Sequence, residues 1–271
     1  MSTALGGFDK VTAVERNGPG RYGARVDPAW DGPGSPLGGV GAATILRAML
    51  AELAAAEFAP RSVTVHFSRP LVHGAAEIQV ETLRRGHHLA TVQAHTVQEG
   101  VVRCAALATF GQAFPEAAAW EADPPAAPPP EESAEVDLPT EQVPHTQHLR
   151  FRPVFGPPPF TGGGAEVLAG GWLELRESRH VDALALCLFA DAWWPAAWGR
   201  VRELVMTPTV ELTVHFRQGL GRPPPGPVLA RFTSRVSREG YWDEDGELWS
   251  GDRRLLAQSR QLRLLRPLAG T

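Results

Sequence analysis

Residues 64–71 read TVHFSRPL and residues 213–220 read TVHFRQGL, and this repeated stretch decides how the whole chain is interpreted. The shared residues are Thr64, Val65, His66, Phe67 and Leu71 in the first copy and Thr213, Val214, His215, Phe216 and Leu220 in the second. A weaker echo follows, where CAALAT at 104–109 stands opposite LAQSRQ at 256–261, each in the expected last strand of its half. Two echoes in the same order predict a duplicated structural unit.

The segment between the two halves has a different composition. It begins PEAAAWEADPPAAPPPEESAEVDLP at residue 115 and is rich in Pro, Ala and Glu. Proline removes backbone donors and disfavours helix, which predicts an extended, solvated connection. We therefore divide the chain into a first repeat at residues 1–114, a linker at 115–147 and a second repeat at 148–271.

The first half is predicted to contain one buried helix among strands. The helix spans about residues 38–58 and carries charge only at Arg47, Glu52 and Glu57, so almost every side of it must be enclosed. Alternating apolar residues and turn signals predict the strands. Their expected ranges are 8–16, 21–27, 62–69, 75–84, 88–98 and 101–110.

The second half repeats this order of elements. A helix is expected at about 180–194. Strands are expected at 149–155, 165–176, 208–217, 227–237, 240–249 and 254–265. A helix followed by several antiparallel strands predicts an α+β unit in which a sheet wraps around the helix, and the chain contains two such units.

Composition narrows the classes of function and the compartment. The net charge of −4 over 271 residues gives no electrostatic footprint for nucleic acid or for an anionic membrane surface. Cys104 and Cys187 lie in apolar runs and are expected to be buried free thiols, and no Cys/His spacing indicates a metal site. The absence of a signal-peptide pattern and of a long apolar run predicts a cytoplasmic protein without a membrane span.

Several runs of sequence resemble the acyl-CoA thioesterase family. In the first half they are PLGGVGAATILRA at 36–48, RSVTVHFSRPL at 61–71 and ETLRRGHHLATVQAHTVQEGVVRCAALATFG at 81–111. In the second half they are DAWWP at 191–195, PTVELTVHFR at 208–217 and LLAQSRQLRLL at 255–265. The resemblance implies a double hot-dog fold, in which each repeat is an antiparallel sheet wrapped around a central helix.

The same resemblance implies an activity and a site. Type II members hydrolyse acyl-CoA thioesters to free acid and coenzyme A without a metal or organic cofactor. An Asp, a Thr and a Gln hold and activate the water, and by motif they fall on Asp191, Thr209 and Gln261. The segment between Asp191 and Thr209 is shorter than expected for bacterial members, and Ala190 stands where a Ser often precedes the Asp.

The three residues also have properties of their own. Asp191 is a carboxylate on an otherwise apolar helix, which makes it the best acid/base candidate in the chain. Regular alternation places Thr209 on the face of its strand that carries Glu211, and Gln261 on the face that carries Arg263. A Gln can both donate to and accept from a water, although surface roles for the Thr and the Gln are common.

Further residues are candidates for substrate binding. Gly38 and Gly39 precede the first predicted helix, whose free N–H groups could bind an oxyanion or a phosphate. Trp193 and Trp194 follow the second helix and could either pack in the core or wall an acyl tunnel. His66 and His215 occupy equivalent places and are interpreted as structural copies, not as a catalytic pair.

Two other functions stay open. A non-catalytic acyl-CoA or acyl-chain binding protein fits the short segment after Asp191, because fold does not fix function. A hot-dog enoyl-CoA hydratase or dehydratase is less favoured, because it would need a His near Asp191 in the sequence. The resemblance also implies an acyl-CoA partner and a homodimer or larger homo-oligomer.

Overall fold

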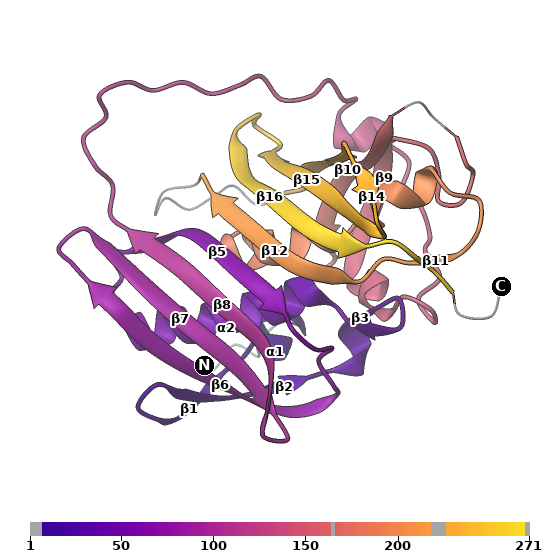
Figure 1. Cartoon of the computed structure of the whole chain (residues 1–271). Helices are drawn as coiled ribbons and strands as arrows, with labels where there is room; N and C mark the ends of the chain where they lie inside the picture. The colour runs from indigo at the N-terminus through magenta and orange to yellow at the C-terminus, as the bar shows by residue number, and fades with distance from the viewer. Residues whose placement is uncertain (1–6, 164–165, 218–225, 269–271) are drawn as a thin grey trace.

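The computed structural model describes residues 7–163, 166–217 and 226–268. It confirms the α+β class and the repeated plan of a sheet wrapped on a helix (Figure 1). The helices are α1 Gly7–Val11, α2 Gly38–Leu53 and α3 Ala183–Phe189, with short 3-10 helices η1 Pro28–Trp30, η2 Pro130–Glu132, η3 Pro144–His148 and η4 Ala196–Gly199. The strands are β1 Glu15–Gly18, β2 Arg21–Val26, β3 Asp31–Gly32, β4 Ser35–Pro36, β5 Ala59–Phe67, β6 Gly74–Arg85, β7 Leu89–Gln98, β8 Val101–Gly111, β9 Leu149–Phe155, β10 Val167–Leu175, β11 Val205–Met206, β12 Thr209–Phe216, β13 Val228–Ser234, β14 Ser237–Arg238, β15 Tyr241–Ser250, β16 Leu255–Leu264 and β17 Arg266–Pro267.

One antiparallel sheet runs through both halves. Its strand order is β1-β2-β6-β7-β8-β5-β12-β16-β15-β13-β10-β9, with β14 paired to β15. We call the half that contains α2 repeat 1 and the half that contains α3 repeat 2. Within each repeat the strands follow one another in corresponding order, and β5 and β12 join the repeats side by side (Figure 1). The predicted strands after α2 and after the linker are confirmed, with ends shifted by at most three residues.

The repeated stretch forms the seam between the halves. Thr64 lies opposite Thr213, Val65 opposite Leu212 and Val63 opposite Val214, so the register is symmetric about the two threonines. Their hydroxyl oxygens are 2.9 Å apart. The predicted duplication therefore corresponds to a pseudo-twofold axis through the seam. Residues 218–220, which complete the second copy, lie outside the described residues.

The predicted match between the two segments of the second echo, CAALAT and LAQSRQ, is wrong by one residue. Leu212 pairs with Gln261, and its counterpart Val63 pairs with Ala108. Gln261 is therefore equivalent to Ala108, and not to Thr109 as the match of CAALAT with LAQSRQ predicted. Side chains alternate between the faces of a strand, so a slip of one residue would exchange inward and outward positions.

The two central helices are enclosed as expected, but both are shorter than predicted. α2 ends at Leu53, because Ala54 adopts a left-handed conformation with φ of 47°. α3 begins only after Asp182, whose carboxylate accepts a hydrogen bond from the Ala185 N–H at 3.0 Å and caps the helix.

The predicted strand over residues 8–16 is wrong in its first part, which forms α1. The Glu177 carboxylate accepts hydrogen bonds from the N–H groups of Gly7 and Phe8 and caps this short helix. Phe8 and Val11, one turn apart, are both buried. Contacts distant in sequence have overridden the local strand propensity.

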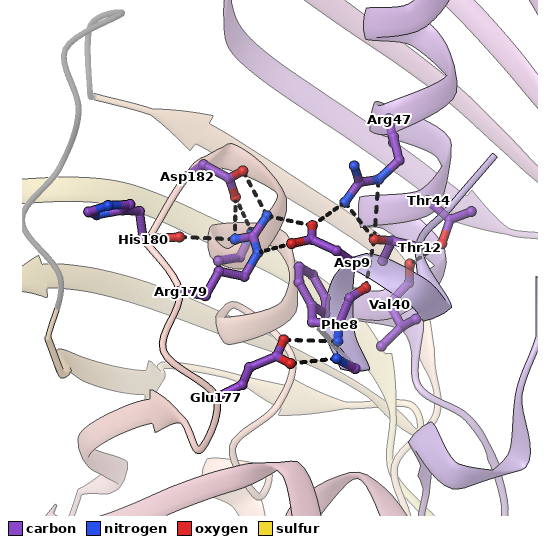
Figure 2. A network of polar contacts seen from close by, with 12 residues as sticks. Phe8, Asp9, Thr12, Val40, Thr44, Arg47, Glu177, Arg179, His180 and Asp182 are labelled. Atoms are coloured by element: carbon purple, nitrogen blue, oxygen red, sulfur yellow. Dashed lines mark hydrogen bonds and ion pairs between the residues drawn. The ribbon is translucent and has the colours of Figure 1, made fainter. Parts of the chain in front are cut away.

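α1 ties the two repeats together through one carboxylate. Asp9 accepts a hydrogen bond from Arg47 on α2 at 2.6 Å and from two nitrogens of Arg179, which precedes α3 (Figure 2). Arg179 also pairs with Asp182 at 2.8 Å and lies over the Phe8 ring at 5.0 Å. The N-terminal segment is thus a strap between the repeats.

Arg179→Ala is expected to lower the free energy of unfolding by about 2–3 kcal/mol, because it leaves two partly buried carboxylates without their shared cation. Although burial raises the pKa of Asp9, hydrogen bonds and charges from Arg179 and Arg47 lower it below its usual 3.8. The ionised Asp9 therefore contributes its full stabilisation of the folded state above the usual pKa of an aspartate. This contribution to the free energy of unfolding is lost as the pH falls through the lower pKa of the folded state.

Urea unfolding of wild type and Arg179→Ala at pH 7 and pH 3 measures the loss of stability and its dependence on pH. Arg16→Ala is the control, since Arg16 forms an exposed ion pair with Glu52 and its loss should cost less than about 0.5 kcal/mol. If Arg179→Ala and Arg16→Ala lost equal amounts of stability at pH 7, the proposed contribution of Arg179 to the contact between the repeats would be wrong.

The linker leaves β8 of repeat 1 and arches over to repeat 2 (Figure 1), and its last part returns to contact Asp31 of repeat 1 through His145. The Pro128 carbonyl accepts a hydrogen bond from the Trp172 indole at 2.8 Å. Glu135 forms ion pairs with Arg150, Arg152 and Arg176. The later part of the linker is therefore docked on the sheet, where a solvated connection was expected.

The two thiols and the helix lengths bear on the protein's surroundings. Cys104 and Cys187 are free and buried, as predicted, and burial raises the pKa of Cys104 to about 12 and also raises that of Cys187. Within the described ranges, every helix is too short or too polar to cross a bilayer.

Candidate active site

The residues predicted to act together meet where the two repeats face each other. Asp191 follows the C-terminal end of α3 in repeat 2, and it lies against the N-terminal end of α2 in repeat 1. Thr209 opens β12, and Gln261 lies in β16 next to it. The structure thus brings Asp191, Thr209 and Gln261 into one cluster, in which Asp191 and Gln261 are buried and Thr209 is partly buried.

Asp191 caps the helix of the other repeat. Its Oδ2 accepts a hydrogen bond from the Gly39 N–H at 2.8 Å, and the residue is only 7% exposed. The N-cap position of α2 is Leu37, whose side chain has no acceptor, so the carboxylate supplies the cap from outside. A helix N-terminus carries partial positive charge, which stabilises an ionised carboxylate there. This stabilisation offsets the unfavourable interaction of the Asp191 carboxylate with the negative C-terminal end of its own helix, α3.

The glycines are needed for this close approach. A Cβ on Gly39 would lie 2.8 Å from the Cys187 carbonyl oxygen and 3.0 Å from that of Leu188. A Cβ on Gly38 would lie 3.0 Å from Asp191 Oδ2. α2 can therefore contact the end of α3 only because these positions carry no side chain. At the helix end that was predicted to bind an anion of the substrate, the Gly39 N–H is bound to the protein's own Asp191 carboxylate.

A β-bulge turns Thr209 inward. Thr209 pairs with Arg263, whereas Glu211 pairs with the adjacent Leu262, so Val210 is an extra residue on β12. Strict alternation predicted that Thr209 shares a face of the strand with Glu211, and that prediction is wrong. The equivalent strand of repeat 1 has a register shift at the same place, between Pro60 and Ser62.

Hydrogen bonds fix the Thr209 hydroxyl and the Gln261 amide. Thr209 Oγ1 donates to Gln261 Oε1 at 2.7 Å and lies 3.5 Å from Asp191 Oδ1. Gln261 Nε2 donates to the Ala190 carbonyl at 3.0 Å, and the residue is 1% exposed. The amide orientation is therefore set by its partners, which suits a group that holds a small polar ligand.

Two charged residues beside Asp191 were missed. The Arg263 Nη1 lies 3.8 Å from Asp191 Oδ1 and 2.9 Å from Glu244 Oε1, and all three side chains are buried. Burial raises the pKa of Glu244, and the charge of Arg263 opposes this shift. The period-2 pattern already placed Arg263 on the face of Gln261, so that signal was available in the sequence.

His145, from η3 of the linker, was also missed. Its Nε2 lies 3.0 Å from the Ala192 carbonyl oxygen and its Nδ1 lies 3.0 Å from that of Asp31. Burial lowers the pKa of His145, although both carbonyls favour the protonated ring. The residue joins repeat 1 to the loop that follows Asp191.

A small hollow with a mainly apolar lining lies beside the same end of α2. Val40, Gly41 and Thr44 of α2 line one side of it, and Ala76 and Ile78 of β6 line the other. Its residues also include Leu37, Leu71 and Thr96. The buried Thr96 hydroxyl has no hydrogen-bond partner among the described residues. Such a hollow fits an apolar chain with a polar atom near its end.

The remaining predicted residues make no hydrogen bond to this cluster among the described residues. The rings of Trp193 and Trp194 are tilted against each other, with centroids 4.7 Å apart, and both pack against Phe151 in the core of repeat 2. His66 and His215 lie exposed on the outer face of the sheet, away from Asp191. In the part of the chain that the structure describes, no group of three His, Cys, Asp or Glu residues could hold a metal ion.

Family models match both halves of the chain. The model of the acyl-CoA thioesterase N-terminal domain matches residues 26–111, and that of the C-terminal domain matches residues 121–265. No curated protein sequence matches.

Solved structures share the fold over the whole length. A conserved protein of unknown function with a hot-dog fold from Alicyclobacillus acidocaldarius is 25% identical, with a TM-score of 0.90 over 98% of this chain and 100% of that one. A protein assigned as a thioesterase II from Thermobifida fusca is 30% identical, with a TM-score of 0.83 over 97% and 98%. The acyl-CoA thioesterase II of Mycobacterium marinum, 21% identical, has a TM-score of 0.76 over 97% and 100%. The expected hot-dog fold is confirmed.

Proposed function

The chain belongs to the acyl-CoA thioesterase family, a family of thioester hydrolases, and on that premise we propose that it hydrolyses an acyl-CoA to free acid and coenzyme A. The observation that carries the proposal is the buried Asp191 carboxylate at the N-terminus of α2, with Thr209 and Gln261 beside it. The same proposal places the three catalytic residues in the second unit, residues 148–271, with residues 115–147 as the connection.

Asp191 acts as the general base in this proposal. Its Oδ2 is held by the Gly39 N–H, which leaves Oδ1 on the side of Thr209. A water held by Thr209 and Gln261 gives its proton to Oδ1 and attacks the thioester carbonyl carbon. The tetrahedral intermediate then breaks the carbon–sulfur bond, and the thiolate takes the proton back from Asp191.

The N-terminus of α2 is the proposed site of oxyanion stabilisation. The first N–H groups of a helix have no partner within the helix. The Gly39 N–H is bound to Asp191, so we assign the role of oxyanion donor to the neighbouring Gly38 N–H. Trp193 and Trp194 are assigned as the packed wall behind Asp191.

The acyl chain is assigned to the hollow beside α2. Val40 and Gly41 line it and lie next to Gly38 and Gly39 along the helix, so an acyl group there would bring its carbonyl near Asp191. The apolar lining supports an acyl chain as ligand, and the small size of the hollow supports a short one.

Thiol release from acyl-CoAs of graded chain length tests the proposal. We expect turnover that depends on chain length and is greatest for short chains. The two buried thiols, Cys104 and Cys187, should not react with the thiol reagent in the folded protein. Tight acyl-CoA binding without turnover would instead support the non-catalytic binding protein, and hydration of crotonyl-CoA would support a hydratase.

We further propose that the protein acts in the cytoplasm as a homodimer or larger assembly. The free thiols support a reducing compartment. Exposed apolar side chains on the strands of repeat 1 support association, and they include Leu83, Leu89 and Leu107. Light scattering in solution measures the mass of the assembly.

A further inference from the structure

Repeat 1 provides an internal comparison for the charged residues next to Asp191. The strand ladders fix the equivalent positions, because Glu244 pairs with Gln261 as Val92 pairs with Ala108, and Arg263 pairs with Thr209 as Phe110 pairs with Pro60. Repeat 2 therefore has Glu244, Gln261 and Arg263 where repeat 1 has, in the same order, Val92, Ala108 and Phe110. All three residues of repeat 1 are fully buried core residues.

The comparison shows that the fold does not require charge at these positions. Burying an ion pair costs desolvation that its mutual attraction often fails to recover, whereas well-packed apolar residues serve as well or better. Repeat 1 adopts the apolar solution on the same backbone. The charges of Glu244 and Arg263 therefore indicate a requirement that only repeat 2 has, and repeat 2 is the half that carries Asp191.

The geometry connects this pair to Asp191. One guanidinium nitrogen of Arg263 lies 2.9 Å from Glu244 Oε1 and 3.8 Å from Asp191 Oδ1. Glu244 is itself fixed, since its Oε2 accepts a hydrogen bond from the Ala196 N–H at 2.8 Å. Arg263 is also anchored by its Nε, which donates to the Thr207 carbonyl at 3.2 Å. The cation is therefore held at a set distance from the proposed base.

Resting on the proposed hydrolysis, we propose that Arg263, held in place by Glu244, is a positioning residue that keeps Asp191 ionised and oriented. The charge of Arg263 acts on Asp191 Oδ1, the oxygen that receives the proton of the water. Glu244 interacts with the same cation and adds a negative charge nearby. The two residues together therefore set how strongly the ionised form of Asp191 is stabilised. Neither residue needs to touch the substrate.

The other groups that face Asp191 are few and differ in kind. His145 of η3 is 3% exposed and reaches the Ala192 carbonyl, one residue away. α2 contributes the Gly39 N–H, and β12 contributes the Thr209 hydroxyl. Arg263 and Glu244 come from β16 and β15. His145 is unchanged in every variant below, so its effect on the pH dependence is constant.

Single variants should move the acid limb of the kcat/KM pH profile in opposite directions. Arg263→Met removes the cation, so Asp191 protonates more readily and the acid limb moves up by about one to two pH units. Activity lost at neutral pH is then partly recovered at higher pH. Glu244→Gln leaves Arg263 wholly to Asp191 and moves the acid limb down. Arg263→Lys keeps the charge and should restore most of the wild-type profile.

The double variant separates positioning from folding. Arg263→Met with Glu244→Gln removes both charges together, so no uncompensated ion is buried and the melting temperature should stay close to that of wild type. We expect its kcat to fall at least about tenfold with KM changed less than about threefold, because orientation of Asp191 is lost. A double variant with wild-type kcat and an unshifted pH profile would overturn the inference.

Carbon-13 NMR of labelled aspartate supplies a readout without turnover. The Asp191 signal is identified by its loss in Asp191→Asn, and its titration midpoint should rise in Arg263→Met and fall in Glu244→Gln. These shifts in a protein that hydrolyses no acyl-CoA would refute the proposed function and leave the electrostatic coupling intact. Turnover with unchanged midpoints would refute the coupling alone.

Discussion

Asp191→Asn is expected to lower kcat for acyl-CoA hydrolysis by about 10³-fold while KM changes less than about threefold, because the amide cannot take a proton from water. The variant should still fold. An Asn oxygen can accept the Gly39 N–H bond that Asp191 Oδ2 now accepts at 2.8 Å. Thiol release across a series of acyl-CoAs measures the loss, and direct binding of acyl-CoA shows that the site is intact.

A matched control lies at the other end of the same helix. Asp182→Asn makes the same chemical change at the N-cap of α3, where Asn is as good a cap as Asp. It should retain wild-type kcat and lose only some stability through its ion pair with Arg179. Full turnover in Asp191→Asn would mean that another group activates the water.

Gly39→Ala is expected to lower the free energy of unfolding by about 2–3 kcal/mol, since the added methyl overpacks a buried helix contact. It would meet the carbonyl oxygens of Cys187 and Leu188 at 2.8 and 3.0 Å, and backbone atoms at a helix end do not move aside easily. Displacing α2 also separates its N-terminus from Asp191. We therefore expect a fall in kcat larger than the loss of stability alone would cause.

Gly41→Ala on the same helix is the control for helix propensity. Its added methyl would meet the Cδ1 of Leu71 at 3.0 Å, a flexible side chain that can shift, and would make an ordinary contact with the Phe67 ring at 3.9 Å. Alanine is favoured over glycine in a helix by about 1 kcal/mol, so Gly41→Ala should be neutral or stabilising. Urea unfolding of the two variants measures the contrast. Equal stability of Gly39→Ala and wild type would show that the contact is not tight.

The strands and the duplication could be predicted because they are written in local patterns. Period-2 alternation gave the inward face of β16, including Gln261 and Arg263, and the repeated TVHF stretch gave the pseudo-symmetry. The proposed catalytic cluster depended on the family resemblance, since Thr209 alone is an ordinary strand residue. The structure then brought its three members together.

What could not be predicted depends on contacts between distant segments. The inward direction of Thr209 comes from a bulge at Val210, and strict alternation has no means of indicating an extra residue. The charge of Asp191 is stabilised by a helix more than a hundred residues away in sequence. α1 forms because Glu177, which is distant in sequence, caps it. The local sequence cannot indicate this cap and therefore predicted a strand.

The seam between β5 and β12 gives each half of the chain an edge that is complementary to itself. Because both edges read TVHF and pair symmetrically about Thr64 and Thr213, either half alone would present the partner it needs for a second copy of the same half. The full chain therefore resembles a dimer of two hot-dog units that are joined covalently by the linker. Once the two copies were joined, only one had to keep the polar site, and the other could fill the same positions with hydrocarbon. When the two repeats of a chain separate, each exposes this edge. We expect the exposed edges of two chains to pair at high protein concentration and to give domain-swapped dimers.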